Sequence, residues 1–574
     1  MNRRRQLAGL ALFGALAAAA SAPEAPFDVL IRNARIVDGA GGSWYRGDIG
    51  VRKGRIARIG RLEGWPTACV IEANERIAAP GFIDVHMHVE EGLLARPEAE
   101  NLIADGVTSI VTGNCGGSEL AIGDWLAKVA QSGAAVNVAS LIGHNSVRPA
   151  VMGNADRAPR PRELAEMESL VKRAMDEGAV GFSTGLIYVP GMFAKVPEMA
   201  RLAGVAALRG GVYATHMRNE NDKVFEAIEE SLAVAHEARI PLQISHFKVT
   251  SPASWGLSAR MLARIEQARQ EGIDVTLDQY PYTASSSGLD VLLPEGAFES
   301  DRYGARRAML DRLKRKRSRR EIAQAMSRRL HDELKRDHLD YAVVASAPWD
   351  RGLERKNLRE INLARRGAGG APRPDTLEAE IETVLDLCLK GGSAGQGPGA
   401  CATQMIYHNM DERDVERILA HPLTMIARDG GVPQLGLGSP HPRSFGAAAR
   451  VLSRYVRERR VIPLEEAVRK MTSLPARRFS LRDRGLLREG FWADIVLFDP
   501  AAVEAASSFE DPHHHSRGFD TVLVNGRVVR DGGRPTGTRA GAILYGDGLI
   551  GTAPPSTADR ALRPFPSALP SLHR

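Results

Sequence analysis

The chain has 574 residues, of which 44% are hydrophobic, and a formal net charge of +7. This length excludes a single small hydrophobic core, and the ordinary apolar content predicts a globular protein of two or three domains, one of them large. Four widely spaced cysteines, Cys69, Cys115, Cys388 and Cys401, are too few to predict a disulfide framework.

The first 22 residues predict a secretory signal peptide. Three arginines precede a short run of Leu, Ala, Gly and Phe, and small residues follow up to Ala22. The apolar run is too short to cross a bilayer. The arginine pairs allow a twin-arginine export route, although the residues around them fit that signal only loosely. We therefore expect a periplasmic or secreted protein without stable membrane insertion after signal removal.

The two ends of the mature chain share one texture, that of short strands separated by glycine turns. It covers residues 23–78, and it returns over 484–548, for example in A-D-I-V-L-F-D-P. We predict one small β domain built from both termini. Beyond it, residues 549–574 are rich in Pro, Ser and Ala and are predicted to be disordered.

Between the two ends, over residues 79–483, apolar strand-like runs alternate with helical stretches. This alternation is typical of a parallel α/β domain, and eight such units predict a TIM barrel. The fold class expected is thus an α/β (β/α)8 barrel with a small β-sandwich domain from both termini. A long insertion is predicted at about 287–415. The eight runs are F-I-D-V-H-M-H, S-I-V-T-G-N-C, V-N-V-A-S-L-I-G-H, A-V-G-F-S-T-G, V-Y-A-T-H, L-Q-I-S-H, D-V-T-L-D-Q-Y and L-T-M-I-A-R-D.

Several of these runs end in a residue that can bind a metal ion. The first run carries two histidines one residue apart, and positions i and i+2 of a strand share a face. In a TIM barrel all the strand ends meet at one face, where active sites lie. Each residue alone could be a core or turn residue, but together imidazole, thiolate and carboxylate suit zinc. The set is His86, His88, Cys115, His216, His246 and Asp429.

The basic charge is concentrated in the predicted insertion. Residues 302–336 contain 14 Lys and Arg against 4 Asp and Glu. The run R-L-K-R-K-R-S-R-R suggests nucleic acid, but no aromatic platform or nucleic-acid module accompanies it. We interpret it as a solvated helical face and expect no nucleic-acid partner.

Several motifs resemble those of a known family. P-G-F-I-D-V-H-M-H, together with the two-part β domain, resembles the amidohydrolase superfamily. G-N-C-G, G-F-S-T-G-L-I-Y-V-P-G, T-H-M-R-N-E, S-H-F-K, D-Q-Y-P-Y-T-A and H-P-R-S-F-G narrow the resemblance to the N-acyl-D-amino-acid deacylases, or D-aminoacylases. The resemblance spans about residues 27–545. It implies zinc-dependent hydrolysis of N-acyl-D-amino acids to a carboxylate and a D-amino acid.

The same resemblance implies roles for individual residues. One zinc ion would be held tightly, and a second metal position would be weaker. Asp429 would act as general base and acid. Cys115 stands where many relatives use a carboxylated lysine, which favours the deacylase branch. The tight ligands would be Cys115, His216 and His246, the weaker ones His86, His88 and Asp429, and the substrate-binding residues Tyr188, Lys248, Tyr280 and Arg443.

One residue departs from the family pattern, and several questions stay open. Arg428 stands where a small residue usually precedes the catalytic Asp429, and it either lowers the pKa of Asp429 or points to the opposite face.

The alternative functions are hydrolysis of cyclic amides or D-residue dipeptides, and a catalytically silent ligand-binding protein. The expected partner is a small N-acyl amino acid. An acidic substrate side chain would need an extra cation from the insertion, whereas an apolar one would favour Leu292, Leu293 and Phe298.

Overall fold

The structure is a computed structural model that describes residues 26–299, 304–365, 371–394 and 399–550. The predicted signal peptide, and the predicted disordered tail from residue 551 onward, lie outside the described residues. Within the described ranges, no helix has both the length and the apolarity needed to cross a membrane.

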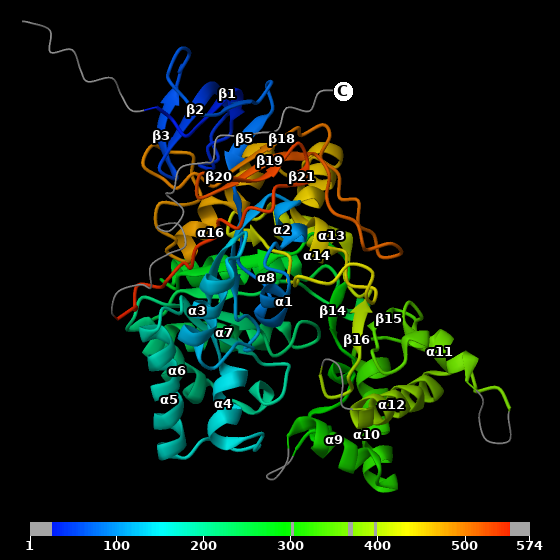
Figure 1. Cartoon of the computed structure of the whole chain (residues 1–574). Helices are drawn as coiled ribbons and strands as arrows, with labels where there is room; N and C mark the ends of the chain where they lie inside the picture. The colour runs from blue at the N-terminus through cyan, green and yellow to red at the C-terminus, as the bar shows by residue number, and fades with distance from the viewer. Residues whose placement is uncertain (1–25, 300–303, 366–370, 395–398, 551–574) are drawn as a thin grey trace, which may run out of the picture.

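Strands from both ends of the chain form one nine-stranded sheet, seen at one end of the molecule in Figure 1. Pro80 of the N-terminal part pairs antiparallel with Ile495 of the C-terminal part, which joins the two halves. Side chains from both halves share one hydrophobic cluster, including Ile31, Ile49 and Leu523. The strands are β1 (Val29–Ile36), β2 (Tyr45–Arg52), β3 (Arg55–Gly60), β4 (Val70–Glu72), β5 (Ile77–Pro80), β18 (Ile495–Phe498), β19 (Phe519–Val524), β20 (Arg527–Asp531) and β21 (Arg534–Pro535).

A ring of parallel strands follows, and it contains all eight predicted runs. The third run is split at Leu141, so that one half pairs with the strand before it and the other half with the strand after it. The ring closes between its first and last strands through two backbone hydrogen bonds, from Asp429 N–H to the His86 carbonyl and from His88 N–H to the Gly430 carbonyl. The strands are β6 (Phe82–Asp84), β7 (Val107–Thr112), β8 (Asn137–Ser140), β9 (Ile142–Gly143), β10 (Gly181–Gly185), β11 (Val212–His216), β12 (Leu242–Ile244), β13 (Val275–Gln279) and β17 (Thr424–Ile426).

Helices cover the outside of this barrel. In α3 the buried residues Ile122, Trp125, Leu126 and Val129 follow the i, i+3, i+4, i+7 spacing of one helical face. The barrel interior is filled by apolar side chains such as Val111, which form a separate cluster. The helices around the barrel are α1 (Glu90–Ala95), α2 (Glu100–Ile103), α3 (Ile122–Ser132), α4 (His144–Met152), α5 (Pro161–Asp176), α6 (Val196–Ala207), α7 (Val224–Ala238), α8 (Ser258–Gln270), α13 (Glu412–Ala420), α14 (Arg443–Arg450), α15 (Leu464–Met471) and α16 (Ser473–Arg478).

The insertion between β13 and β17 folds around a core of its own (Figure 1). A three-stranded antiparallel sheet, in the order β14-β16-β15, connects it to the barrel. Several arginines of the basic run form ion pairs, such as Arg319 with Glu382 at 2.7 Å and Arg317 with Glu321 at 2.9 Å. The elements are β14 (Ser285–Gly288), α9 (Ala305–Leu313), α10 (Lys316–Ser327), β15 (Ala342–Ser346), α11 (Leu358–Ala364), α12 (Leu377–Ala394) and β16 (Gln404–Tyr407).

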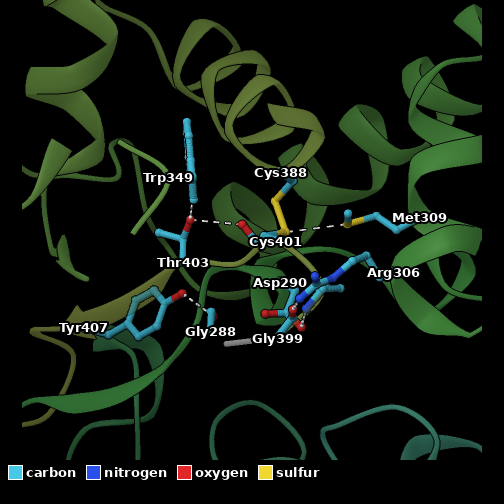
Figure 2. Close-up of a disulfide and its surroundings, with 11 residues drawn as sticks. Gly288, Asp290, Arg306, Met309, Trp349, Cys388, Gly399, Cys401, Thr403 and Tyr407 are labelled. Atoms are coloured by element: carbon cyan, nitrogen blue, oxygen red, sulfur yellow. Dashed lines mark hydrogen bonds between the residues drawn. A yellow bond between two sulfur atoms is a disulfide. The ribbon is translucent and has the colours of Figure 1, made fainter. Parts of the chain in front are cut away.

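One disulfide, which sequence reasoning missed, joins Cys388 of α12 to Cys401 (Figure 2). Cys69 and Cys115 are free thiols. Figure 2 shows that the Thr403 hydroxyl donates to the Cys401 carbonyl and accepts from the Trp349 indole. A single bond is not a framework, and composition carried no signal for it, because the pairing depends on how the insertion folds.

Candidate active site

The six predicted ligands lie together at the carboxyl ends of the barrel strands. His246 Nε2 lies 3.6 Å from the sulfur of Cys115 and 3.0 Å from His216 Nδ1. His86 Nε2 lies 3.2 Å from the same sulfur. Ligand atoms around a tetrahedral zinc ion are about 3.3–3.6 Å apart, given zinc–ligand bonds of about 2.0–2.3 Å. The spacing of these donor atoms therefore suits one ion held between them.

A second group of donor atoms adjoins the first. His88 Nε2 lies 3.2 Å from Asp429 Oδ1, and His86 Nε2 lies 3.6 Å from the same oxygen. His86 Nε2 is thus closer to the Cys115 sulfur than to the Asp429 oxygen, although sequence reasoning assigned His86 to the second group alone. The arrangement places two adjacent candidate metal positions with His86 between them.

Three of the six residues have a left-handed backbone, which side chains other than glycine rarely adopt. The φ angle is +53° at Cys115, +34° at His246 and +50° at Asp429. Such conformations cost about 1–3 kcal/mol each and persist only where the surrounding structure enforces them, as at functional sites. Each of these residues lies two or three positions after the end of a barrel strand, at the mouth of the barrel.

Two of these residues have strongly shifted acidities. Burial would raise the pKa of the Cys115 thiol, but His86 and the other two imidazoles hold it well below its usual range. Burial would likewise raise the pKa of Asp429, but the Arg443 guanidinium, and next His86, hold it well below its usual range. Arg443 Nη2 lies 2.8 Å from Asp429 Oδ2. The site therefore favours a thiolate and an ionised carboxylate, both suited to a metal ion.

Two cavities with shared walls open onto this centre. A cavity of about 110 Å³ is lined by Tyr188, Lys248, Tyr280 and Asp429, among others. A neighbouring cavity of about 540 Å³ is lined by Cys115, Tyr188, Asp429 and Arg443, among others. All four predicted substrate-binding residues therefore lie around the candidate metal positions. Their roles stay predictions.

The amidohydrolase family model matches residues 69–288 and 402–530. N-acyl-D-glutamate deacylase from Alcaligenes xylosoxydans xylosoxydans is 36% identical over 549 residues, which cover 92% of this chain and 98% of that protein. D-aminoacylase from the same organism is 34% identical, covering 90% of this chain and 98% of that protein. The chain belongs to the D-aminoacylase family of amidohydrolases.

A solved structure supports the same membership. N-acyl-D-glutamate deacylase from Bordetella bronchiseptica, complexed with zinc and a phosphonate inhibitor, matches with a TM-score of 0.75 and 33% identity, over 91% of this chain and 100% of that chain. The predicted fold class is confirmed, and membership makes the protein a metal-dependent hydrolase. The family model skips residues 289–401, a stretch that covers most of the insertion.

The departure from the D-aminoacylase pattern at Arg428 has a structural explanation. The side chain is buried and is directed to two carboxylates other than Asp429. Its Nε lies 2.8 Å from Asp84 Oδ2, and its Nη2 lies 2.9 Å from Asp105 Oδ2. The cation that lowers the pKa of Asp429 is Arg443, and Arg428 is committed to two other carboxylates.

Sequence reasoning missed two carboxylates that support the ligands. Asp278 Oδ1 lies 3.3 Å from His86 Nδ1 and accepts a hydrogen bond from the backbone N–H of His246. Glu220 Oε1 lies 3.0 Å from His246 Nδ1. Carboxylates of this kind orient metal-binding histidines and fix which ring nitrogen faces the ion. Both lie within motifs used for the family resemblance, T-H-M-R-N-E and D-Q-Y-P-Y-T-A. Their place in these motifs is the sequence feature that could have identified them.

Proposed function

We propose that the protein hydrolyses the amide bond of N-acyl-D-amino acids with the help of bound Zn²⁺. The observation that carries the proposal is the buried Cys115 sulfur surrounded by imidazoles, with the ionised Asp429 beside it. The named activities of the two curated relatives support the substrate class, and the zinc in the structure from Bordetella bronchiseptica supports the metal.

The residues present fit a zinc ion. Cys115, His216 and His246 would hold it tightly, and His86, His88 and Asp429 would form a weaker second position. His216 Nδ1 and His246 Nε2 lie 3.0 Å apart, and His246 Nε2 lies 3.6 Å from the Cys115 sulfur, so all three ligands present a donor atom to one position. When bound, zinc lowers the pKa of a coordinated water to about 7 and polarises a carbonyl.

The chain's own groups would carry the proton and orient the substrate. Asp429 would accept a proton from the attacking water and return it to the leaving amine. Arg443 Nη1 is buried and lacks a hydrogen-bond partner within the described residues, so it can donate to a substrate carboxylate. Burial, and next the Cys115 charge, raises the pKa of Tyr188 well above its usual value. That phenol therefore stays protonated and can donate a hydrogen bond.

The test is release of free amino acid by the zinc-loaded mature protein. The substrates would be N-acetyl derivatives of Met, Leu, Phe, Glu and Asp, each in the D and L forms. We expect release from the D forms and roughly hundredfold slower release from the L forms, because a site shaped for one enantiomer misplaces the scissile amide of the other. Absence of release from every D form with zinc bound would contradict the proposal, and cyclic amides and D-residue dipeptides would be tried next.

We also propose that the protein is exported to the periplasm or secreted. The predicted signal peptide and the Cys388–Cys401 disulfide support this location, because disulfides persist in oxidising compartments. In fractionated cells we expect the periplasmic chain to begin after Ala20 or Ala22. Cys388 and Cys401 should resist a thiol reagent that labels the exposed Cys69. An intact N-terminus on a cytosolic protein would refute the proposal.

A further inference from the structure

Two arginines of the insertion line the smaller cavity without a carboxylate partner. Arg329 and Arg336 belong to the wall that also contains Lys248, Tyr280 and Asp429. Within the described chain neither forms an ion pair. Arg329 makes only a long hydrogen bond of 3.5 Å to the Val291 carbonyl. Both lie in the stretch that the family model skips.

The other Lys or Arg side chain of this cavity is already paired, because Lys248 Nζ lies 2.6 Å from Glu220 Oε1. Arg443 lines the larger cavity, and its Nη2 pairs with Asp429 at 2.8 Å. The same holds for arginines elsewhere in the insertion, such as Arg317, which pairs with Glu321 on the outer surface. Arg329 and Arg336 therefore give the cavity wall positive charge that no carboxylate of the described residues neutralises.

The guanidinium of Arg336 is held in place but has a donor atom without a hydrogen-bond partner in the described structure. Its guanidinium lies 4.1 Å from the centroid of the Tyr341 ring, which fixes its plane. Its Nη2 is buried and has no hydrogen-bond partner in the described structure. Burial lowers the pKa of Arg336, a sign that the environment penalises the unpaired cation. An anion that enters the cavity would offset the cost of burying this cation and would accept a hydrogen bond from Nη2.

The apolar alternative from the sequence has less support. Of the three apolar residues named from the sequence, Leu292 lines the cavity, next to Leu330 and Leu334, whereas Leu293 and Phe298 are buried in the core of the insertion. These leucines have no unsatisfied group for a ligand to complete, whereas Arg336 has one. The amino-acid portion of the substrate is assigned to this cavity, because two of the predicted substrate-binding residues, Lys248 and Tyr280, line it. Arg443, proposed to bind the α-carboxylate, lies at its edge, with the guanidinium 4.4 Å from the centroid of the Tyr280 ring. The acyl group is then left to the larger neighbouring cavity.

We propose that Arg336, with Arg329 beside it, binds a second carboxylate carried by the substrate's side chain, so that the preferred substrates are N-acyl derivatives of D-glutamate or D-aspartate. This inference rests on the proposed function. It adds to that function a specificity determinant supplied by the insertion, and it chooses between the two side-chain classes that the sequence left open.

The test compares kcat/KM for acid and amide pairs, N-acetyl-D-Glu with N-acetyl-D-Gln and N-acetyl-D-Asp with N-acetyl-D-Asn. We expect at least one acid to be preferred over its amide by more than tenfold. Arg336→Met should lower kcat/KM for that acid roughly ten- to hundredfold and leave the amide within threefold. Arg336→Lys should retain part of the preference, and Arg329→Met should show a smaller loss.

Arg317→Met is the matched control, because it removes an arginine of the same insertion from the outer surface, and it should change neither substrate. A second measurement needs no turnover: calorimetry should detect tighter binding of D-Glu than of D-Gln, and Arg336→Met should abolish the difference. Equal losses for acid and amide in Arg336→Met, or no preference in the natural protein, would overturn the inference.

Two further outcomes separate this inference from its foundation. If amides and apolar D substrates are hydrolysed as fast as the acids, the proposed function stands and the inference fails. If no N-acyl-D-amino acid is hydrolysed at all, the proposed function itself fails. N-succinyl-D-Leu adds a carboxylate on the acyl side, and an Arg336-dependent preference for it over N-acetyl-D-Leu would overturn the side-chain assignment.

Discussion

Replacing Asp429 with asparagine is expected to lower kcat for N-acyl-D-amino-acid hydrolysis by roughly a thousandfold, within the range of about 10²–10⁴ for general acid–base groups. The carboxylate lies against His88 and His86 and is held ionised by Arg443, so it is placed to accept a proton. An amide keeps the shape and one oxygen but cannot accept that proton. Steady-state kinetics on the zinc-loaded variant measures the effect.

Two controls separate proton transfer from other losses. Metal analysis of Asp429→Asn should find the tight zinc retained, because Cys115, His216 and His246 are unchanged. Glu220→Gln removes the other carboxylate of the cavity, which faces Lys248 and His246 Nδ1. If its role is orientation, it should cost about ten- to a hundredfold in activity, less than Asp429→Asn. A loss larger in Glu220→Gln than in Asp429→Asn would reverse the assignment of the base.

The substitution Arg428→Met is expected to lower the free energy of unfolding by about 3–5 kcal/mol, the usual cost of removing one partner from a buried ion pair. Arg428 is the shared partner of Asp84 and Asp105, and all three side chains are almost fully buried. Asp105 also accepts hydrogen bonds from the Ser516 hydroxyl and from two backbone N–H groups of α14, those of Ala448 and Ala449. The ion pair therefore connects the barrel to the terminal domain. Urea unfolding measures the change.

The loss in Arg428→Met should grow with pH. Burial raises the pKa of Asp105, and Arg428 is the main influence that opposes the rise. Without Arg428 the folded pKa rises further above the unfolded value of about 4, so stability is retained below that value and is lost as pH increases. The deficit should be larger at pH 8 than at pH 5. The matched control Arg264→Met removes a pairing with the exposed Glu229 and should cost under about 1 kcal/mol. An Arg428→Met deficit equal to that control would disprove the bridge.

Features with a local periodic signal could be predicted from the sequence. Each barrel strand is a short apolar run between turn residues, and a buried parallel strand has that composition wherever it occurs. The six candidate ligands were found because parallel strands bring their carboxyl ends to one face, which turns sequence position into proximity. A β domain shared by both termini was predicted at a coarser level, from the similar short-strand pattern of the two ends, but the pairing of Pro80 with Ile495 was not.

Features that depend on where a side chain points could not be predicted. Asp278, inside β13, and Glu220, in the turn after β11, became supports only because the fold brings them next to His86 and His246. The direction of Arg428 required Asp84 and Asp105 to be located first. The positive φ angles at three candidate ligands, the Cys388–Cys401 bond and the cavity-facing Arg336 all arise from tertiary packing, which no local pattern records.

The terminal sheet has a consequence for the order of synthesis. β5 is made early, but its partner β18 leaves the ribosome only after the whole barrel and insertion have been translated. Until then the early half-sheet has an unpaired edge and an uncovered apolar face, a state prone to aggregation. Such a distant pairing also closes slowly. The N-terminal strands of the nascent chain therefore need protection until translation ends. A chain truncated before β18 cannot complete the sheet, so only full-length molecules reach the folded state.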